Sequence, residues 1–211
     1  MLVQKSAAVL RAEARMSLEG KWLSMAAFTF VYLSLCLGIS YVPLIFPPSY
    51  FLTTVVLAVQ VFVLIPFQMG YMAMVRQAQG STPDLTALFL LFNPVYYLRI
   101  IGTCLLMGLF VILWSLLLIV PGIIAAFRYS QAFWIILQDP SCGCNEALDR
   151  SSAMMIGNKW KLFCLELSFI GWAILAVCTF GIGYMWLMPY IIMAMYQFYC
   201  EVTVSTSAQL V

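Results

Sequence analysis

Three long stretches of the chain contain no charged residue: residues 22–75, 100–127 and 167–200. Each exceeds the roughly 20 residues that a helix needs to cross a hydrocarbon core of about 30 Å, and two are long enough for a pair of helices. None alternates between apolar and polar positions, as a membrane-spanning strand would. The pattern therefore predicts membrane-spanning helices.

Proline, glycine and short polar stretches divide the apolar residues into six predicted spans, arranged as three hairpins. The hairpins cover residues 22–76, residues 95–138 and residues 160–200. Pro66 and Pro189 lie inside spans, where proline kinks a helix. We therefore expect an all-α, polytopic membrane helix bundle that forms a single domain over residues 1–211, with short cytoplasmic helices at the membrane interface.

Two more polar segments lie between or before the hairpins. Residues 1–21 form an amphipathic segment, and residues 139–159 form a second helix or loop. One helical face of the first segment carries only apolar residues, namely Val3, Ala7, Leu10, Ala14 and Leu18. This spacing is typical of a helix lying on the membrane surface. An exposed extension is the alternative.

The basic residues predict the orientation. Three predicted loops, around residues 42–50, 119–122 and 180–183, carry no charge. Nine of the ten basic residues fall on the other side: Lys5, Arg11, Arg15, Lys21, Arg76, Arg99, Arg150, Lys159 and Lys161. Because lysine and arginine in short loops stay in the cytoplasm, we expect both termini there.

Composition agrees with a lipid environment and excludes several functions. The chain is 64% hydrophobic and 9% charged, whereas soluble domains are roughly half apolar and about a quarter charged. It contains no histidine, which excludes a Ser-His-Asp triad and an HExxH zinc site. Cys142 and Cys144 alone supply too few ligands for zinc. We expect no enzymatic activity, no metal or other cofactor, and no nucleic-acid partner.

Two charged residues inside predicted spans stand out, Arg128 and Glu166. A charge near the centre of a membrane helix costs at least about 2.5–3.5 kcal/mol and often has a function. The two residues lie on consecutive antiparallel spans, so an ion pair between them is geometrically feasible. Tyr129, Ser130 and Gln131 complete a candidate polar cluster. The alternatives are a purely structural pair, or a Glu166 side chain that reaches the interface.

Two similar segments precede the first and the fifth span. Residues 16–22 read Met-Ser-Leu-Glu-Gly-Lys-Trp, and residues 154–160 read Met-Met-Ile-Gly-Asn-Lys-Trp. Lysine marks the cytoplasmic face and tryptophan the membrane interface. The expected interface anchors are Lys21, Trp22, Lys159 and Trp160. The similarity predicts an internal repeat of three units, and chance resemblance between apolar sequences is the alternative.

Several runs in the second half of the chain carry a family resemblance. They are Asn-Glu-Ala-Leu-Asp-Arg-Ser at 145–151, Met-Ile-Gly-Asn-Lys-Trp-Lys-Leu-Phe at 155–163, Leu-Ser-Phe-Ile-Gly-Trp at 167–172, Thr-Phe-Gly-Ile-Gly at 179–183 and Trp-Leu-Met-Pro-Tyr at 186–190. With them the chain resembles, over essentially its whole length, the bacterial membrane family catalogued as domain of unknown function 975. A weaker similarity is to the membrane domain of some glycerophosphodiester phosphodiesterases.

The resemblance implies a multi-pass protein of the bacterial cytoplasmic membrane, and it supplies no activity. Our leading hypothesis is a non-enzymatic accessory or membrane-homeostasis component that acts through helix or lipid contacts. The alternative is a small-solute or lipid transporter or channel with a polar seam at Arg128 and Glu166, and a third is an intramembrane enzyme acting on lipid. The expected partner is the lipid bilayer. A second copy of the chain or another membrane protein is a further possible partner.

The orientation can be tested by thiol labelling. In a variant without native cysteines, Ile45→Cys and Gly80→Cys should react with a membrane-impermeant reagent from opposite sides of the membrane, because the two positions lie at opposite ends of predicted spans. Equal labelling of both positions would contradict the predicted orientation.

Overall fold

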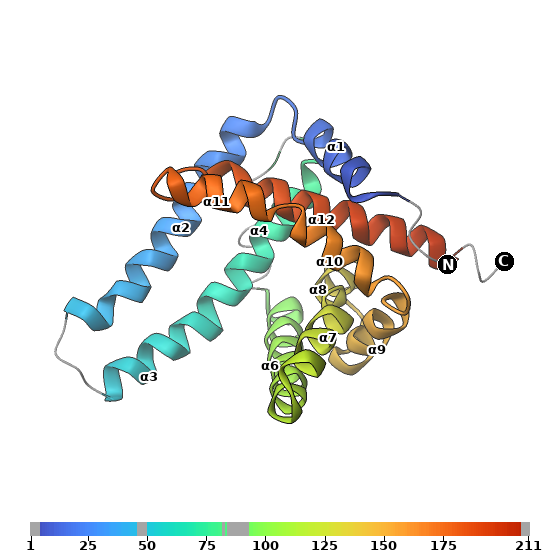
Figure 1. Ribbon diagram of the computed structural model, residues 1–211. Coiled ribbons are helices and arrows are strands. Elements are labelled where there is room, and N and C mark those ends of the chain that lie inside the picture. Colours follow the sequence, from blue (N-terminus) through green and yellow to red (C-terminus); the bar gives the residue numbers. More distant parts are fainter. Residues whose placement is uncertain (1–4, 46–49, 82, 84–92, 208–211) are drawn as a thin grey trace.

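The computed structural model describes residues 5–45, 50–81, 83 and 93–207, and all regular structure in these ranges is helical (Figure 1). The helices of the first half are α1 (Ala7–Ser17), α2 (Trp22–Ile45), α3 (Tyr50–Val59), the π-helical turn η1 (Gln60–Leu64), α4 (Ile65–Gln77) and α6 (Pro94–Leu117). Those of the second half are α7 (Ile119–Tyr129), α8 (Ala132–Gln138), α9 (Cys144–Met154), α10 (Lys159–Leu167), α11 (Ile170–Cys178) and α12 (Tyr184–Ser207).

Five segments in the described ranges are long and apolar enough to cross a membrane. They are Trp22–Val42, Tyr50–Gln77, Tyr96–Leu116, Ile119–Gln138 and Lys159–Cys178. They coincide with the first five predicted spans, and the prediction of an all-α, multi-pass membrane protein is confirmed. The sixth span and the grouping into three hairpins stay predictions.

The sixth predicted span corresponds to α12, which has a different character from the other five. This helix passes beneath α1 and across α4 (Figure 1). Met193, Ala194, Phe198 and Val202 are fully buried along it. Because protein surrounds much of α12, its side chains need not all be compatible with lipid. This explains why α12 carries more polar and aromatic residues than the other spans.

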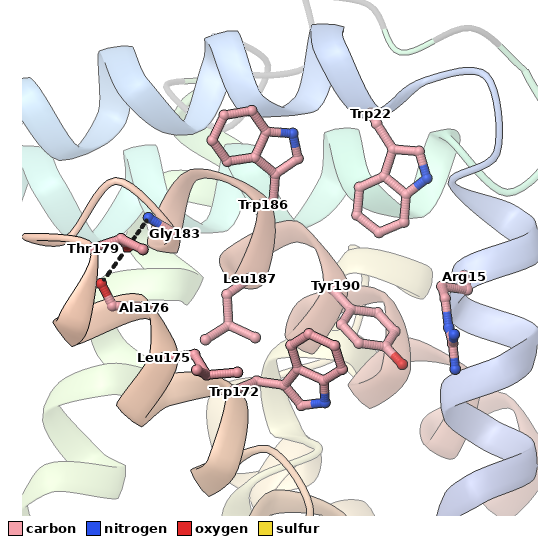
Figure 2. Close-up of a pocket in the computed structure, with 10 residues that line it drawn as sticks. All are labelled: Arg15, Trp22, Trp172, Leu175, Ala176, Thr179, Gly183, Trp186, Leu187 and Tyr190. Carbon is pink, nitrogen blue, oxygen red and sulfur yellow. Dashed lines mark hydrogen bonds between the residues drawn. The ribbon is translucent and has the colours of Figure 1, made fainter.

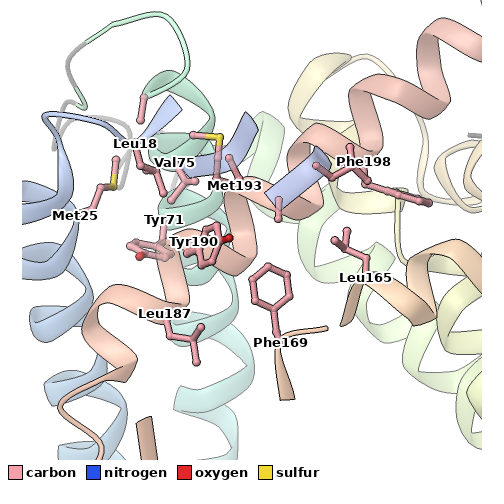
Figure 3. Close-up of a cluster of buried hydrophobic side chains, with 14 of the residues drawn as sticks. Leu18, Met25, Tyr71, Val75, Leu165, Phe169, Leu187, Tyr190, Met193 and Phe198 are labelled. Carbon is pink, nitrogen blue, oxygen red and sulfur yellow. The ribbon is translucent and has the colours of Figure 1, made fainter. Parts of the chain in front are cut away.

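Buried apolar side chains form two clusters. The first joins α1, α4, α10 and α12 around Tyr71, Leu165, Met193 and Phe198 (Figure 3). The second lies among α6, α8 and α9, and Tyr199 of α12 also belongs to it. The helix α12 therefore contributes to both clusters and links the two halves of the chain.

The apolar face of α1 packs on protein. Leu10, Ala14 and Leu18 are at most 2% exposed, and α1 contacts α12 and α10. Small alanine side chains on this face allow the helices to approach closely. The apolar face that the sequence predicts is therefore covered by protein at these three residues, and the placement of this helix on the membrane surface stays a prediction. Val3 lies outside the described residues.

The two similar segments make the same kind of corner. Gly20 and Gly157 have φ angles of +75° and +77°, a conformation that residues with a Cβ rarely adopt. The first glycine lies between α1 and α2 and the second between α9 and α10. A left-handed glycine is a common way to end a helix. The shared corner is consistent with the repeat, which itself stays a prediction.

Basic side chains from the predicted cytoplasmic side donate hydrogen bonds to backbone carbonyls at or near helix ends. The donor–acceptor pairs are Lys21 with Ala78, Arg76 with Leu137, Arg11 with Ser168 and Arg99 with Cys142. Three of these carbonyls lie in the last turn or at the cap of α4, α8 or α10. A cation there stabilises the negative end of the helix dipole and satisfies a carbonyl that has no partner within its own helix.

Two ionic groups fix the ends of surface segments. Lys5 pairs with Glu13 at 2.8 Å and with Glu201 of α12 at 3.3 Å, and the hydrogen bond to Glu13 raises the pKa of Lys5. In the loop between α8 and α9, hydrogen bonds from Ser141, followed by the interaction with Arg150, lower the pKa of Asp139. The first group ties the segment before α1 to the C-terminal part of α12.

The turn between α11 and α12 requires two special backbone positions. The amide of Phe180 donates to the carbonyl of Val177 at 2.9 Å, and the amide of Gly181 donates to Ala176 at 3.0 Å. This is the Schellman pattern, with Phe180 in the left-handed region at φ 54°. The second special position is Gly183, where an added Cβ would lie 2.8 Å from the Cα of Ala176. The helices α11 and α12 can therefore approach this closely only with glycine at position 183.

Gly183→Ala should lower the stability of the folded protein in detergent by about 1–3 kcal/mol, because the added methyl group overpacks the turn. Gly171→Ala is the matched control, since a Cβ added to Gly171 in α11 would meet nothing within 4 Å. That change should be neutral or stabilise by up to about 1 kcal/mol. Thermal unfolding measures both, and equal melting temperatures would refute the close approach.

Candidate functional site

The candidate polar cluster lies where the fourth predicted span breaks into α7 and α8. The break occurs at Ser130 and Gln131. The hydroxyl of Ser130 donates to the carbonyl of Phe127 at 2.9 Å, and the side-chain amide of Gln131 donates to that hydroxyl at 2.9 Å. A broken helix needs such partners, because each unsatisfied backbone group in hydrocarbon costs several kcal/mol.

Two serines of α9 complete the break from outside the span. The hydroxyl of Ser151 donates to the carbonyl of Arg128 at 2.9 Å and accepts the amide of Gln131 at 3.2 Å. Its neighbour Ser152 accepts a hydrogen bond from Nε of Arg128. Neither serine is predicted from the sequence, because nothing in a polar segment indicates which hydroxyl contacts a helix that is distant in sequence.

The remaining members of the cluster are buried beside this network. Tyr129 is 8% exposed and stacks on Phe110 with ring centroids 5.8 Å apart. The guanidinium of Arg128 lies 5.6 Å from the centroid of the Tyr129 ring. Gln131 is 1% exposed, and within the described residues its Oε1 atom has no hydrogen-bond partner. The structure thus brings Arg128, Tyr129, Ser130 and Gln131 together, with Tyr129 and Gln131 buried and Arg128 exposed.

Glu166 does not join this group. Its side chain is exposed on α10, and none of the ion pairs in the described ranges joins it to Arg128. The Arg128–Glu166 pair, which is geometrically feasible from the sequence, is therefore not formed in the described residues. The reason is that α9 packs against α7 and α8, which places the hydroxyl of Ser152 at the guanidinium.

The four expected interface anchors have different surroundings. Lys21 donates to the carbonyl of Ala78, and the Trp22 ring lies edge-on to Tyr190 at 6.2 Å. Trp160 is 71% exposed and lies near Phe163, with ring centroids 5.2 Å apart. Trp22 therefore packs within the protein, while Trp160 keeps the exposure expected of an interface anchor.

A groove with an aromatic lining lies between α11, α12 and the ends of α1 and α2. Its volume is about 330 Å³. Figure 2 shows Trp22 and Trp186 on one side, Trp172 on the opposite side, and Leu187 and Tyr190 between them. The turn at Thr179–Gly183 closes one end of the groove, where the hydroxyl of Thr179 accepts the amide of Gly183 and donates to Ala176.

Arg15 lies at the other end of the groove. Its guanidinium carbon is 6.0 Å from the centroid of the Tyr190 ring. Arg15 and Trp22 also border a more polar surface hollow, together with Met16 and Glu19. The groove is therefore apolar and aromatic along most of its length, and it becomes charged and exposed at Arg15. The sequence indicates Trp22 as an interface anchor, and nothing in its pattern predicts the groove.

Comparison with known proteins identifies the second half of the chain. Residues 116–206 match a family model described as "Protein of unknown function (DUF975)". The chain is therefore similar to the DUF975 family over these residues. The resemblance expected from the sequence is confirmed over this region, whereas the similarity to glycerophosphodiester phosphodiesterase membrane domains is not shown. A search of curated proteins and of solved structures finds no match to the chain.

The DUF975 region contains most of both features. It spans α7 to α12, which include the break at Ser130, the serines of α9 and the groove residues Trp172 and Tyr190. Arg15 and Trp22 come from the part of the chain before the match. The N-terminal segment thus adds the charged end to a groove whose apolar walls belong mainly to the DUF975 region.

Ser151→Ala should lower stability by about 1–3 kcal/mol, because it leaves the amide of Gln131 and the carbonyl of Arg128 without their partner in a buried place. Ser24→Ala is the matched control, since Ser24 is exposed on α2, and it should change stability by less than about 0.5 kcal/mol. Unfolding in detergent measures the difference. Equal effects of the two changes would show that α9 does not support the break.

Proposed function

We propose that this protein is a non-enzymatic accessory component of the membrane that acts by holding a lipid amphiphile in the groove lined by Trp22, Trp172 and Trp186. The observation that carries the proposal is the combination of an apolar aromatic slot with one cation, Arg15, at its end.

The chemistry of the groove selects the class of ligand. Pockets of about 300–1,000 Å³ with mostly apolar walls and few polar groups are typical of small-ligand sites. Tryptophan and tyrosine rings bury a large apolar area, which suits an acyl chain. A guanidinium binds a carboxylate or phosphate through two parallel hydrogen bonds. A single acyl chain with an anionic head therefore fits the groove in one direction, with its head at Arg15.

The groove supports binding rather than catalysis. Arg15 is the charged residue of its lining, and the hydroxyl of Thr179 is already engaged by Ala176 and Gly183. General acid–base chemistry requires a titratable side chain within hydrogen-bond reach of the reacting group, and the lining contains no aspartate, glutamate, histidine, cysteine or lysine. A transporter with a seam between Arg128 and Glu166 receives less support, because the two residues are not paired.

The same proposal includes the location of the protein. The basic side chains that bind helix ends support an orientation with both termini in the cytoplasm, since lysine and arginine stay on that side. A bacterial cytoplasmic membrane is the location that the family resemblance suggests. In this orientation Arg15 lies at the headgroup level of the inner leaflet, where an anionic lipid head is available.

The groove can be tested by lipid binding to the purified protein. Trp172→Ala should weaken binding of a fluorescent fatty acid by about tenfold, because it removes an aromatic wall whose contact with the acyl chain we expect to contribute about 1.4 kcal/mol. Trp160→Ala is the control, since Trp160 is exposed and outside the groove. If both variants bind as the wild type does, the groove is not the site.

The charged end has its own test. Arg15→Gln should weaken binding of the fatty acid, and it should leave binding of an uncharged monoacylglycerol unchanged. Arg150→Gln removes a cation that pairs with Asp139 and Glu146 outside the groove, and it should affect neither ligand. Equal loss of both ligands in Arg15→Gln would contradict the role of the guanidinium as the head-binding group.

A further inference from the structure

A second feature outside the aromatic groove joins two cations to an apolar trough. A cleft of about 240 Å³ lies along α7, and its lining residues are Trp114, Pro121, Ile124, Ala125, Arg128 and Lys159. The cations lie at the end of the trough that the sequence places toward the cytoplasm, and Pro121 lies at the other end.

The trough follows one face of α7. Pro121, Ile124, Ala125 and Arg128 are spaced by three, one and three residues, so they lie along the same side of the helix. Seven residues of helix span about 10 Å. Ile124 and Trp114 are 48% and 46% exposed, and both lie in segments that can cross a membrane. The cleft therefore opens sideways, toward the acyl chains of the bilayer.

The two cations have no acidic partner in the described part of the chain. None of the ion pairs found there involves Arg128 or Lys159. Charged side chains inside a span are normally paired or face water. Nε of Arg128 donates a hydrogen bond to the hydroxyl of Ser152. The two terminal nitrogens of the guanidinium can therefore donate to another acceptor.

The start of α10 adds to the positive potential. Lys159 is the first residue of this helix. The first amides of a helix carry a partial positive charge and favour an anion. An arginine, a lysine and a helix start thus converge at one end of a trough that is otherwise apolar.

We propose that this cleft binds an anionic glycerophospholipid from the cytoplasmic leaflet. Its phosphate accepts hydrogen bonds from Arg128 and Lys159, and one acyl chain lies between Trp114 and the Pro121–Ala125 face of α7. The bound phosphate is the missing counter-charge of Arg128. This site is separate from the aromatic groove, and its occupancy does not depend on the function proposed for that groove.

The cleft also selects among headgroups. A phosphatidylglycerol head carries one net negative charge on its phosphate, which both cations attract. The ammonium of phosphatidylethanolamine would find no carboxylate in the lining and would lie near Lys159, where like charges repel. We therefore expect phosphatidylglycerol to bind more tightly than phosphatidylethanolamine.

Site-specific photo-crosslinking tests the proposal. The full-length protein is reconstituted into phosphatidylethanolamine nanodiscs that contain a trace of phosphatidylglycerol with a photoreactive acyl chain, and crosslinked peptides are mapped by mass spectrometry. We expect crosslinks in residues 114–125, reduced by an excess of unlabelled phosphatidylglycerol and not by added phosphatidylethanolamine. Crosslinks spread evenly over all exposed spans, or equal competition by both lipids, would overturn the proposal.

Variants of Lys159 separate the lipid contact from the folding role of Arg128. Lys159→Gln leaves the Arg128–Ser152 bond in place and should reduce crosslinking at 114–125 by about tenfold, the effect of losing one charged hydrogen bond. Lys159→Arg should retain it. Trp172→Ala, in the aromatic groove, should leave these crosslinks unchanged. If Lys159→Gln crosslinks as the wild type does, the cation does not hold the lipid.

One further arm distinguishes a lipid from free phosphate. Inorganic phosphate added at physiological concentration should not displace the phosphatidylglycerol crosslink, because it lacks the acyl chain that occupies the trough. If inorganic phosphate abolishes the crosslinks at 114–125, the cleft is a phosphate site and the lipid assignment is wrong.

Discussion

A break in a membrane-spanning helix leaves backbone amides and carbonyls without partners inside the helix, and these groups need other hydrogen-bond partners in hydrocarbon. The fold depends on the side chains that supply these partners. The fourth and fifth predicted spans each break, at Ser130 and at Ser168. Each such group costs several kcal/mol if it is unsatisfied. The partners come from elsewhere in the chain: Ser151 of α9 serves the first break, and Arg11 of α1 donates to the carbonyl of Ser168 at the second. The short helices α1 and α9 therefore hold the broken spans together.

Sequence patterns predict the parts of this fold that depend on local composition. Long charge-free stretches correctly predict helices and five membrane-crossing segments, because the length of an apolar run directly reflects the thickness of the bilayer. They do not distinguish α12, which is buried in protein rather than in lipid. They identify Arg128 as unusual but not its partner, because Ser152 lies in a polar segment whose packing on α7 and α8 is a tertiary property. The aromatic groove is likewise invisible, since its walls come from Trp22 and Trp172, which are distant in sequence.

The groove and the cleft follow one physical pattern. In each, tryptophan and aliphatic side chains form an apolar trough, and a cation lies at one end: Arg15 in the groove, Arg128 and Lys159 in the cleft. Such a pattern matches an amphiphile, whose charged head and apolar chain have different requirements. A protein without histidine can still recognise lipid in this way, because recognition needs shape and charge rather than proton transfer. The DUF975 region supplies the whole α7 face of the cleft and most of the groove.

Hydrogen–deuterium exchange in lipid nanodiscs tests most directly whether side chains of α1 and α9 satisfy the broken spans. If they do, the amides from Arg128 to Ile135 and from Leu165 to Ala173 should exchange as slowly as those in the middle of α7 and α11, because protected groups exchange only when the structure opens. Rapid exchange confined to the two breaks, with slow exchange in the helices on either side, would contradict the account.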